Sequence, residues 1–261
     1  MLSEILDSSL LQAKAARSSL KKLPSRIVGR SPSAKAGEYL ENYSQCLINR
    51  QIDIFDDTLL LLENERIASA CALSRGMIET YAFSRLLGEK ISKILDSKSG
   101  QESVDACIDI TLKFTNSSRF KQSEQKRVAS NIFDIADYHL TDEAIKRLLN
   151  SLATSEHVLN ALRELYADEM KHTNMKESQF EITYDILSEW VHPSQTSIFH
   201  QYTSEAHLVP TSYGMVSILD GAKLNCARAM QFIIESKEIH QWLIHLSKEM
   251  TKRSVAADSS G

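Results

Sequence analysis

Apolar side chains recur every three to four residues along most of this chain, the spacing that places them on one face of an α-helix. The pattern predicts a first helix that begins near Leu2 and is closed by Pro24, and a second from Glu38 to about Leu62. A third follows from Ile67 to about Leu95, and only two charged residues interrupt its part from Ile67 to Ser84. A helix that is apolar nearly all round is predicted to be buried at the centre of its fold.

The helical spacing continues through the second half of the chain. Ser178 and Glu181 have the spacing of a capping box, in which each side chain accepts a hydrogen bond from a backbone N–H at the start of a helix. That helix is predicted to end at His192, because Pro193 cannot continue it. The remaining predicted elements are two helices within 101–138, helices over 142–152 and 155–171, a long loop over 193–212 and a C-terminal helix over 213–253.

The composition agrees with a helical fold. The 261 residues include only 8 Gly and 4 Pro, too few for a β-sandwich or barrel with its frequent turns. Hydrophobic residues make up 43% and charged residues 25%, which is near the average of globular proteins. We therefore predict an all-α protein, a single bundle of about eight helices with a long C-terminal helix. The predicted organisation is an N-terminal helix and basic arm over 1-37, a bundle domain over 38-253 and a disordered tail over 254-261.

The cysteines and the aliphatic runs indicate the cellular compartment of the protein. Cys46, Cys71, Cys107 and Cys226 form no Cys-x-x-Cys pair, so we predict four reduced core residues without a zinc or redox motif. The longest aliphatic run, Leu59 to Leu62, is far too short to cross a membrane, and the N-terminus lacks the pattern of a signal peptide. The sequence thus predicts a cytoplasmic protein with no membrane partner.

Positive charge is concentrated near the N-terminus. Residues 8–37 hold seven basic residues and no acidic one, although the whole chain has a net charge of −4. Such an arm contacts nucleic acid, anionic lipid or an acidic partner, or else forms a solvated or subunit-facing surface. The residues predicted to bind nucleic acid are Lys21, Lys22, Arg26 and Arg30.

The two charges of the predicted central helix are Arg75 and Glu79. At this spacing the two side chains are helix neighbours and can pair. Within an apolar helix they must be paired or hydrogen-bonded, because a lone buried charge costs several kcal/mol. They form either an internal ion pair that fixes the helix register or a site, in which Arg binds phosphate and Glu acts as a base or orients the Arg.

A second polar set follows about a hundred residues later. Tyr184, Ser188 and His192 lie one turn apart from one another and fall on one side of the predicted helix, beside its apolar face. His192 is either a group that bonds the last carbonyls of its helix or a proton-transfer group held by the other two. We predict that Arg75 and Glu79 face this set across a helix interface, because buried polar groups need partners.

Glu169 with His172 and Glu189 with His192 form two Glu-x-x-His motifs of the kind found in di-iron bundles. Only 20 residues separate the two motifs, which leaves no room for the intervening helix that a di-iron site requires. We therefore predict no metal and no cofactor. The glycine-rich and histidine motifs of nucleotide hydrolases, Rossmann enzymes, α/β-hydrolases and zincins are also absent from the sequence.

The Arg-x-x-x-Glu helix and the later Tyr-x-x-x-Ser-x-x-x-His-Pro-Ser motif, which ends at Ser194, resemble a bacterial family of uncharacterised helical domains. That family is in turn similar to the HEPN domains, helical bundles of RNA-cleaving toxins and phage-defence proteins. HEPN nucleases carry an Arg one to two turns before a His and cleave RNA without metal. At those positions this chain has Asp185, Ile186 and Leu187, so the sequence leaves open whether the protein is an enzyme.

The resemblance implies an RNA-binding or metal-independent ribonuclease domain with a stress or phage-defence role. His192 would be the general acid or base, Arg75 the group that stabilises phosphate charge, and Glu79 its orienter, with Tyr184 and Ser188 holding His192. Two alternatives stay open: a catalytically silent interaction module that dimerises through the C-terminal helix, and a small-ligand sensor. The predicted partners are RNA and a second copy of the chain.

Overall fold

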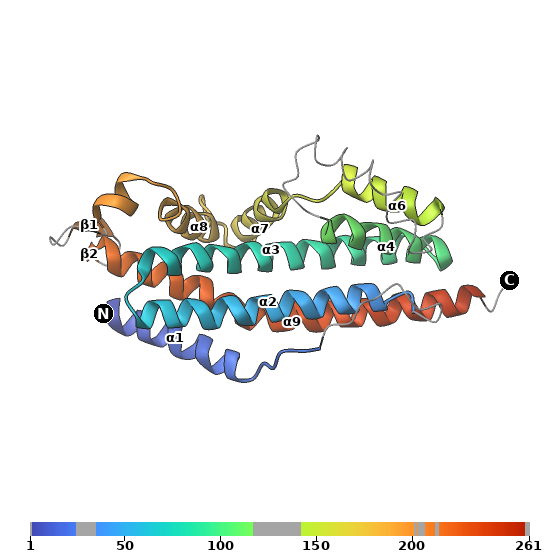
Figure 1. Ribbon diagram of the computed structural model, residues 1–261, viewed down its shortest axis with the longest axis horizontal. Coiled ribbons are helices and arrows are strands. Elements are labelled where there is room, and N and C mark those ends of the chain that lie inside the picture. The colour runs from blue at the N-terminus through green and yellow to red at the C-terminus, as the bar shows by residue number, and fades with distance from the viewer. Residues whose placement is uncertain are drawn as a thin grey trace. The chain divides into compact units, whose positions relative to one another are not determined.

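The computed structural model describes residues 2–24, 35–116, 142–200, 202, 207–211 and 214–258. Eight α-helices lie in these ranges, together with a π-helical turn (η2) and a two-stranded hairpin (Figure 1). The prediction of an all-α fold with about eight helices and a long C-terminal helix is confirmed. The elements are α1 Leu2–Ser18, α2 Glu38–Glu63, α3 Ile67–Ser97, α4 Gly100–Thr115, α6 Asp142–Ala153, α7 Val158–Thr173, α8 Gln179–Glu189, η2 Thr196–His200, β1 Leu208–Thr211, β2 Gly214–Ser217 and α9 Ile218–Asp258.

The chain forms two compact units. Unit 1 consists of Met1–Ser25, Gln45–Ser84 and Ala161–Gln241, and unit 2 of Arg26–Ser44, Arg85–Asn160 and Trp242–Gly261. Since each unit collects three separate stretches, α2, α3, α7 and α9 each contribute residues to both. The predicted boundary after residue 37 stays a prediction.

Unit 1 has an apolar core to which four helices contribute. Ala13 of α1, Phe55 of α2, Met77 of α3 and Ile233 of α9 are all at most 1% exposed and belong to one cluster. The α3 stretch from Ile67 to Ser84 is largely buried, which confirms the predicted central helix. On the surface, Arg17 of α1 donates two hydrogen bonds, of 2.8 and 2.6 Å, to Asp56 of α2.

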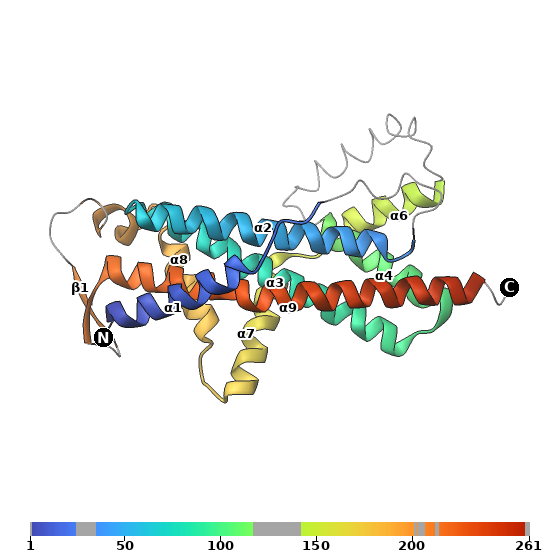
Figure 2. The same cartoon turned by 90° about the horizontal axis from the view of Figure 1, so that it is seen from below.

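In unit 2, a close approach of two helices at a glycine and several polar side-chain contacts hold the elements together. A Cβ on Gly88 of α3 would lie 2.5 Å from the ring of Trp242, so the absence of a side chain lets α9 pack against α3 here. Lys90 Nζ lies 2.5 Å from a carboxylate oxygen of Glu156. Where α6 packs against α4 (Figure 2), Asn116 Nδ2 donates to Ser151 Oγ over 2.8 Å.

The prediction of a loop over 193–212 is wrong in part. The region includes η2 and the strand β1, which pairs antiparallel with β2 from Leu208 opposite Ser217 to Thr211 opposite Gly214. Gly214 enters β2 with φ at 101°, a conformation that residues with a Cβ rarely adopt. Because residues 214–217 form a strand, α9 begins at Ile218 and not at Tyr213.

Other helix ends also differ from the prediction. α9 continues to Asp258, so residues 254–258 are helical and not a disordered tail. Arg253 explains the extension in part, since its Nη1 donates to the carbonyls of Leu95 and Lys98 over 2.7 and 2.9 Å. α1 ends at Ser18, before Pro24, and α7 begins at Val158. The second helix predicted within 101–138 lies outside the described residues.

All four cysteines have free thiols. Cys71, Cys107 and Cys226 are buried as predicted, and the Sγ atoms of Cys71 and Cys226 lie 3.6 Å apart within unit 1. Cys46 is exposed, which corrects its assignment to the core, because its position on α2 faces away from the packed side. In the described ranges, no helix combines the length and the hydropathy that crossing a bilayer requires.

Candidate functional site

The start of α8 is fixed by two side chains. Ser178 Oγ accepts a hydrogen bond of 3.0 Å from the backbone N–H of Glu181, which confirms the serine half of the predicted capping box. Glu169 of α7 supplies a carboxylate, whose Oε2 accepts from Ser178 Oγ at 2.5 Å and from the N–H of Phe180 at 3.1 Å. Glu169 thus ties α7 to α8, a role that its Glu-x-x-His spacing did not indicate.

Arg75, Glu79 and Tyr184 form one polar cluster inside unit 1. Arg75 Nε donates to Glu79 Oε1 at 3.0 Å and to the Tyr184 hydroxyl at 2.9 Å, and that hydroxyl donates to Glu79 Oε1 at 2.8 Å. The Arg75 guanidinium carbon also lies 4.8 Å from the centre of the Tyr184 ring, within cation–π range. Tyr184 is 8% exposed, whereas the Arg75 and Glu79 side chains are 18% and 25% exposed. The predicted meeting of α3 and α8 at these residues is confirmed.

This environment keeps Tyr184 protonated. Burial, the hydrogen bond to Glu79 and the charge of Glu79 raise the pKa of Tyr184 to about 12, although Arg75 acts in the opposite direction. At neutral pH the hydroxyl is therefore a fixed hydrogen-bond donor and a poor proton-transfer group.

Tyr166 of α7 was not singled out by the sequence. Its hydroxyl is buried and has no hydrogen-bond partner in the part of the chain that the structure describes. Burial, followed by the charges of Tyr184 and neighbouring carboxylates, raises the pKa of Tyr166. A single Tyr on the apolar side of a helix belongs to no motif. The buried hydroxyl of Tyr166 therefore becomes evident only from the packing of α7 in the structure.

Ser188 and His192 do not join the cluster. Ser188 Oγ donates to the carbonyl of Tyr184 on its own helix, at 2.7 Å. His192 lies beyond the last residue of α8, its side chain is exposed, and its ring makes no hydrogen bond to a residue that the structure describes. The prediction that both residues face Arg75 is therefore wrong. The Ser188 hydroxyl bonds within its own helix, and α8 ends at Glu189, before the next turn would present the His192 ring.

The basic arm is partly neutralised within unit 1. Lys14 pairs with Glu63, Arg17 with Asp56, and Lys22 with Asp53, so α2 supplies an acidic face for the arm. Lys21 is exposed. Arg26 and Arg30 lie outside the described residues, and binding of nucleic acid by the arm stays a prediction.

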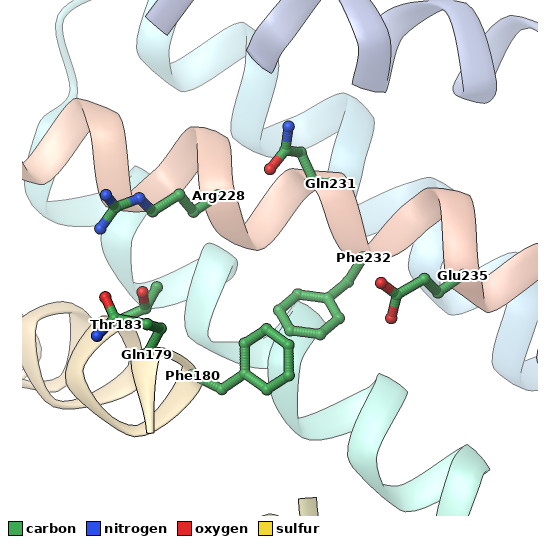
Figure 3. Close-up of a pocket in the computed structure, with 7 residues that line it drawn as sticks. All are labelled: Gln179, Phe180, Thr183, Arg228, Gln231, Phe232 and Glu235. Atoms are coloured by element: carbon green, nitrogen blue, oxygen red, sulfur yellow. The ribbon is translucent and has the colours of Figure 1, made fainter. Parts of the chain in front are cut away.

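A groove of about 240 Å³ lies between α8 and α9. Its floor includes the rings of Phe180 and Phe232, whose centres are 5.1 Å apart (Figure 3). Phe232 also contacts Tyr81 of α3, with ring centres 4.6 Å apart, so the floor is anchored in the core. Figure 3 shows Arg228 and Glu235 at opposite ends of the groove with the two rings between them. The other lining residues are Gln179, Thr183 and Gln231.

Sequence reasoning missed this groove. Arg228, Gln231, Phe232 and Glu235 have the spacing of one helix face, but polar residues that flank an apolar stripe are typical of any surface helix. The signal appears only when α8 brings Phe180 and Thr183 to that face.

The acidic and histidine residues of the described ranges form no group of three or more, with or without cysteine, that could hold a metal ion. Glu169, half of one Glu-x-x-His motif, accepts the hydrogen bonds that start α8.

Comparison with known proteins gives one match, a family model that covers residues 41–206, more than half of the chain. The matched region includes Arg75, Glu79 and Tyr184 and the α8 side of the groove, and it ends before α9. No curated protein and no solved structure matches the sequence. The predicted membership of an uncharacterised family is confirmed, and the chain belongs to DUF5677, a family of unknown function.

Proposed function

We propose that this protein binds RNA by holding an unpaired base in the groove between α8 and α9. The observation that carries the proposal is the ring of Phe180. This ring is partly exposed at the groove, contacts the buried Phe232 with the two ring planes tilted by 60°, and is bordered by groups that can hydrogen-bond to the edges of a base. Proteins that bind single-stranded RNA stack bases on aromatic rings and bind the base edges with amide, hydroxyl and charged side chains. The volume of about 240 Å³ falls below the roughly 300 to 1,000 Å³ typical of sites for drug-sized ligands, so it suits one base.

The geometry favours binding over cleavage. Metal-independent cleavage needs a proton-transfer group and a charge-stabilising group at the same phosphate, within about 3 Å of the reacting atoms. Arg75 is engaged by Glu79 and Tyr184, and the exposed His192 ring makes no contact with this cluster. We therefore propose that the protein is an RNA-binding domain that has no nuclease activity of its own. The resemblance to HEPN domains supports a cytoplasmic role in bacterial stress or phage defence, and this part of the proposal rests on that resemblance alone.

The test measures affinity for a fluorescently labelled, unstructured RNA strand by polarisation. Removing a stacking ring costs about 1 to 3 kcal/mol per base, so Phe180→Ala should weaken binding about 5- to 100-fold. Arg66→Gln is the matched control, because Arg66 is exposed in unit 1 and does not line the groove. A melting curve of each variant separates loss of binding from loss of folding.

Several outcomes would contradict the proposal. If Phe180→Ala binds like wild type while Lys21→Ser binds more weakly, the basic arm and not the groove contacts RNA. If wild type fragments the RNA in the presence of EDTA and His192→Ala does not, the nuclease function implied by the HEPN resemblance is correct. If free nucleotides bind and RNA does not, the groove belongs to a small-ligand sensor.

Dimerisation through the C-terminal helix stays a prediction. Phe232, Ile233 and Leu246, which the sequence places on the apolar side of this helix, are at most 6% exposed within one chain. Their burial serves the protomer itself, so the proposed RNA binding does not depend on a second copy.

A further inference from the structure

Two thiols meet in the core of unit 1. Cys71 of α3 and Cys226 of α9 are both fully buried, and their Sγ atoms lie 3.6 Å apart. The two residues are 155 positions apart in the sequence, so their contact depends on the packing of α3 against α9. Cys46 is an exposed free thiol, and Cys107 is a buried free thiol of unit 2. These two residues serve as references for the pair.

The two sulfur atoms are close enough to become bonded. A disulfide has an S–S length of about 2.05 Å, so the atoms have to approach each other by only about 1.5 Å. Rotation about the Cα–Cβ bonds can supply a shift of this size. The fold therefore holds the two thiols next to each other in advance of any reaction.

We infer that Cys71 and Cys226 form a redox-sensitive pair, which hydrogen peroxide oxidises to a disulfide that joins α3 to α9 within unit 1. One thiolate attacks a peroxide oxygen and breaks the O–O bond, which gives a sulfenic acid and hydroxide. The second sulfur then attacks the sulfenic sulfur, forms the S–S bond and displaces the sulfenic oxygen as water. In total the two thiols lose two electrons and two protons, and the peroxide is reduced to two molecules of water.

Burial sets the conditions under which this disulfide forms. The hydrogen bond with Cys226 and burial raise the pKa of Cys71, so little of the reactive thiolate is present at neutral pH. Cys71 lies in the second turn of α3 and Cys226 in the third turn of α9, so local opening at these helix starts exposes the pair to peroxide. We expect the exposed Cys46 to react first, and the pair to respond only to stronger or longer oxidation.

The disulfide should stabilise the protein, because it closes a loop of 155 residues and so restricts the unfolded chain. Removing or adding such a bond changes the melting temperature of a domain of this size by roughly 5 to 15 °C. The oxidised chain should therefore melt that much higher than the reduced chain. This inference goes beyond the proposed function, and none of its measurements uses RNA.

The test uses the full chain with the change Cys46→Ser, which removes the exposed thiol, and hydrogen peroxide as the oxidant. After the peroxide is removed, the chain is denatured, its free thiols are alkylated and its intact mass is measured. We expect a loss of two hydrogens, a single alkylated thiol at Cys107, and one pair of joined peptides in a digest without reductant. Reduction of the denatured chain should restore three alkylated thiols.

The matched control is Cys107→Ala, which removes a buried thiol outside the pair and should leave the loss of two hydrogens unchanged. Cys71→Ala and Cys226→Ala should each abolish that loss. If either variant fails to fold, the joined peptides of the parent chain still identify the bond. Oxidation of the thiols to sulfinic or sulfonic acids without a joined peptide pair overturns the inference. A disulfide that leaves the melting temperature unchanged or lowers it contradicts the stabilising cross-link between α3 and α9.

Discussion

Helix α3 carries two Arg-x-x-x-Glu pairs, ten residues apart, that differ in their surroundings. Arg75 and Glu79 lie in unit 1, and Arg85 and Glu89 lie in unit 2. In both pairs the Arg Nε lies 3.0 Å from the Glu Oε1, and the four side chains are all 18% to 31% exposed. The first pair also exchanges hydrogen bonds with Tyr184 of α8, whose ring lies under the guanidinium.

The comparison shows that spacing and exposure do not decide what an ion pair does. An i, i+4 pair on one helix supports that helix by only about 0.2 to 0.5 kcal/mol. Once a buried hydroxyl from a second helix binds both charges, each of the three groups depends on the other two. The Arg75 cluster thus fixes α8 against α3, and α8 carries Phe180 and Thr183 of the groove.

We expect the largest effect on stability from removing the positive charge of Arg75 from the cluster. Arg75→Leu leaves Glu79 and the Tyr184 hydroxyl without their cation, and we expect a loss of about 2 to 3 kcal/mol in the free energy of unfolding. This is less than the 3 to 5 kcal/mol of a fully enclosed pair, because Arg75 and Glu79 retain some solvent contact. Arg85→Leu, the matched change in a pair that has no hydrogen bond to Tyr184, should cost less than Arg75→Leu. Denaturant titration followed by circular dichroism measures both, and equal losses would contradict the distinction.

A smaller effect is expected from ionising Tyr184. Its pKa rises from the ordinary value of 10.0 to about 12 in the folded protein, so the unfolded chain loses this proton first. The stabilisation is fully present below pH 10 and is lost as the pH rises to about 12, by about 2 kcal/mol. Tyr184→Phe should reduce this alkaline loss. The remainder includes the contributions of Tyr166 and of the buried Cys107 thiol, whose pKa values are also raised.

The control for the alkaline loss is Asn116→Ala, which removes a hydrogen bond of 2.8 Å to Ser151 in unit 2 without removing a titratable group. Denaturation midpoints measured across pH 8 to 12 should show the wild-type slope in this variant. An unchanged slope in Tyr184→Phe would contradict the assignment of the alkaline loss to Tyr184.

The sequence predicts the long helices well. Of the five residues that it assigns to the polar cluster, it places Arg75, Glu79 and Tyr184 correctly. Apolar periodicity over Ile67–Leu95 extends through eight turns, and two charges within it demand partners, so both α3 and the Arg75–Glu79 pair follow from local physics. Tyr184 follows by the same reasoning from α8. Its hydrogen bonds to both members of the pair confirm this.

The sequence misplaces His192 and misses the hairpin and the groove, and each of these has its own physical cause. The sequence places His192 in the cluster because it predicts a helix that continues to His192, but α8 stops at Glu189 and the chain turns before the His192 ring could face α3. The hairpin was missed because β1 and β2 have only four residues each, too few for a period of two to be distinguished from a loop. The groove requires two helices to meet, and no single-helix pattern contains that information.

The smallest effect is expected when the whole cluster is replaced at once. In the triple variant Arg75→Leu, Glu79→Leu and Tyr184→Phe, no charge or hydroxyl of the cluster is left without its partner. Well-packed apolar residues often replace such groups at little or no cost, so we expect stability within about 1 kcal/mol of wild type. The triple variant should therefore be more stable than Arg75→Leu alone, and the difference measures the coupling among the three side chains. The double variant Arg85→Leu and Glu89→Leu should show almost no such recovery over Arg85→Leu. A triple variant that is less stable than Arg75→Leu, by the sum of the losses of the single variants, would show that the three groups act independently.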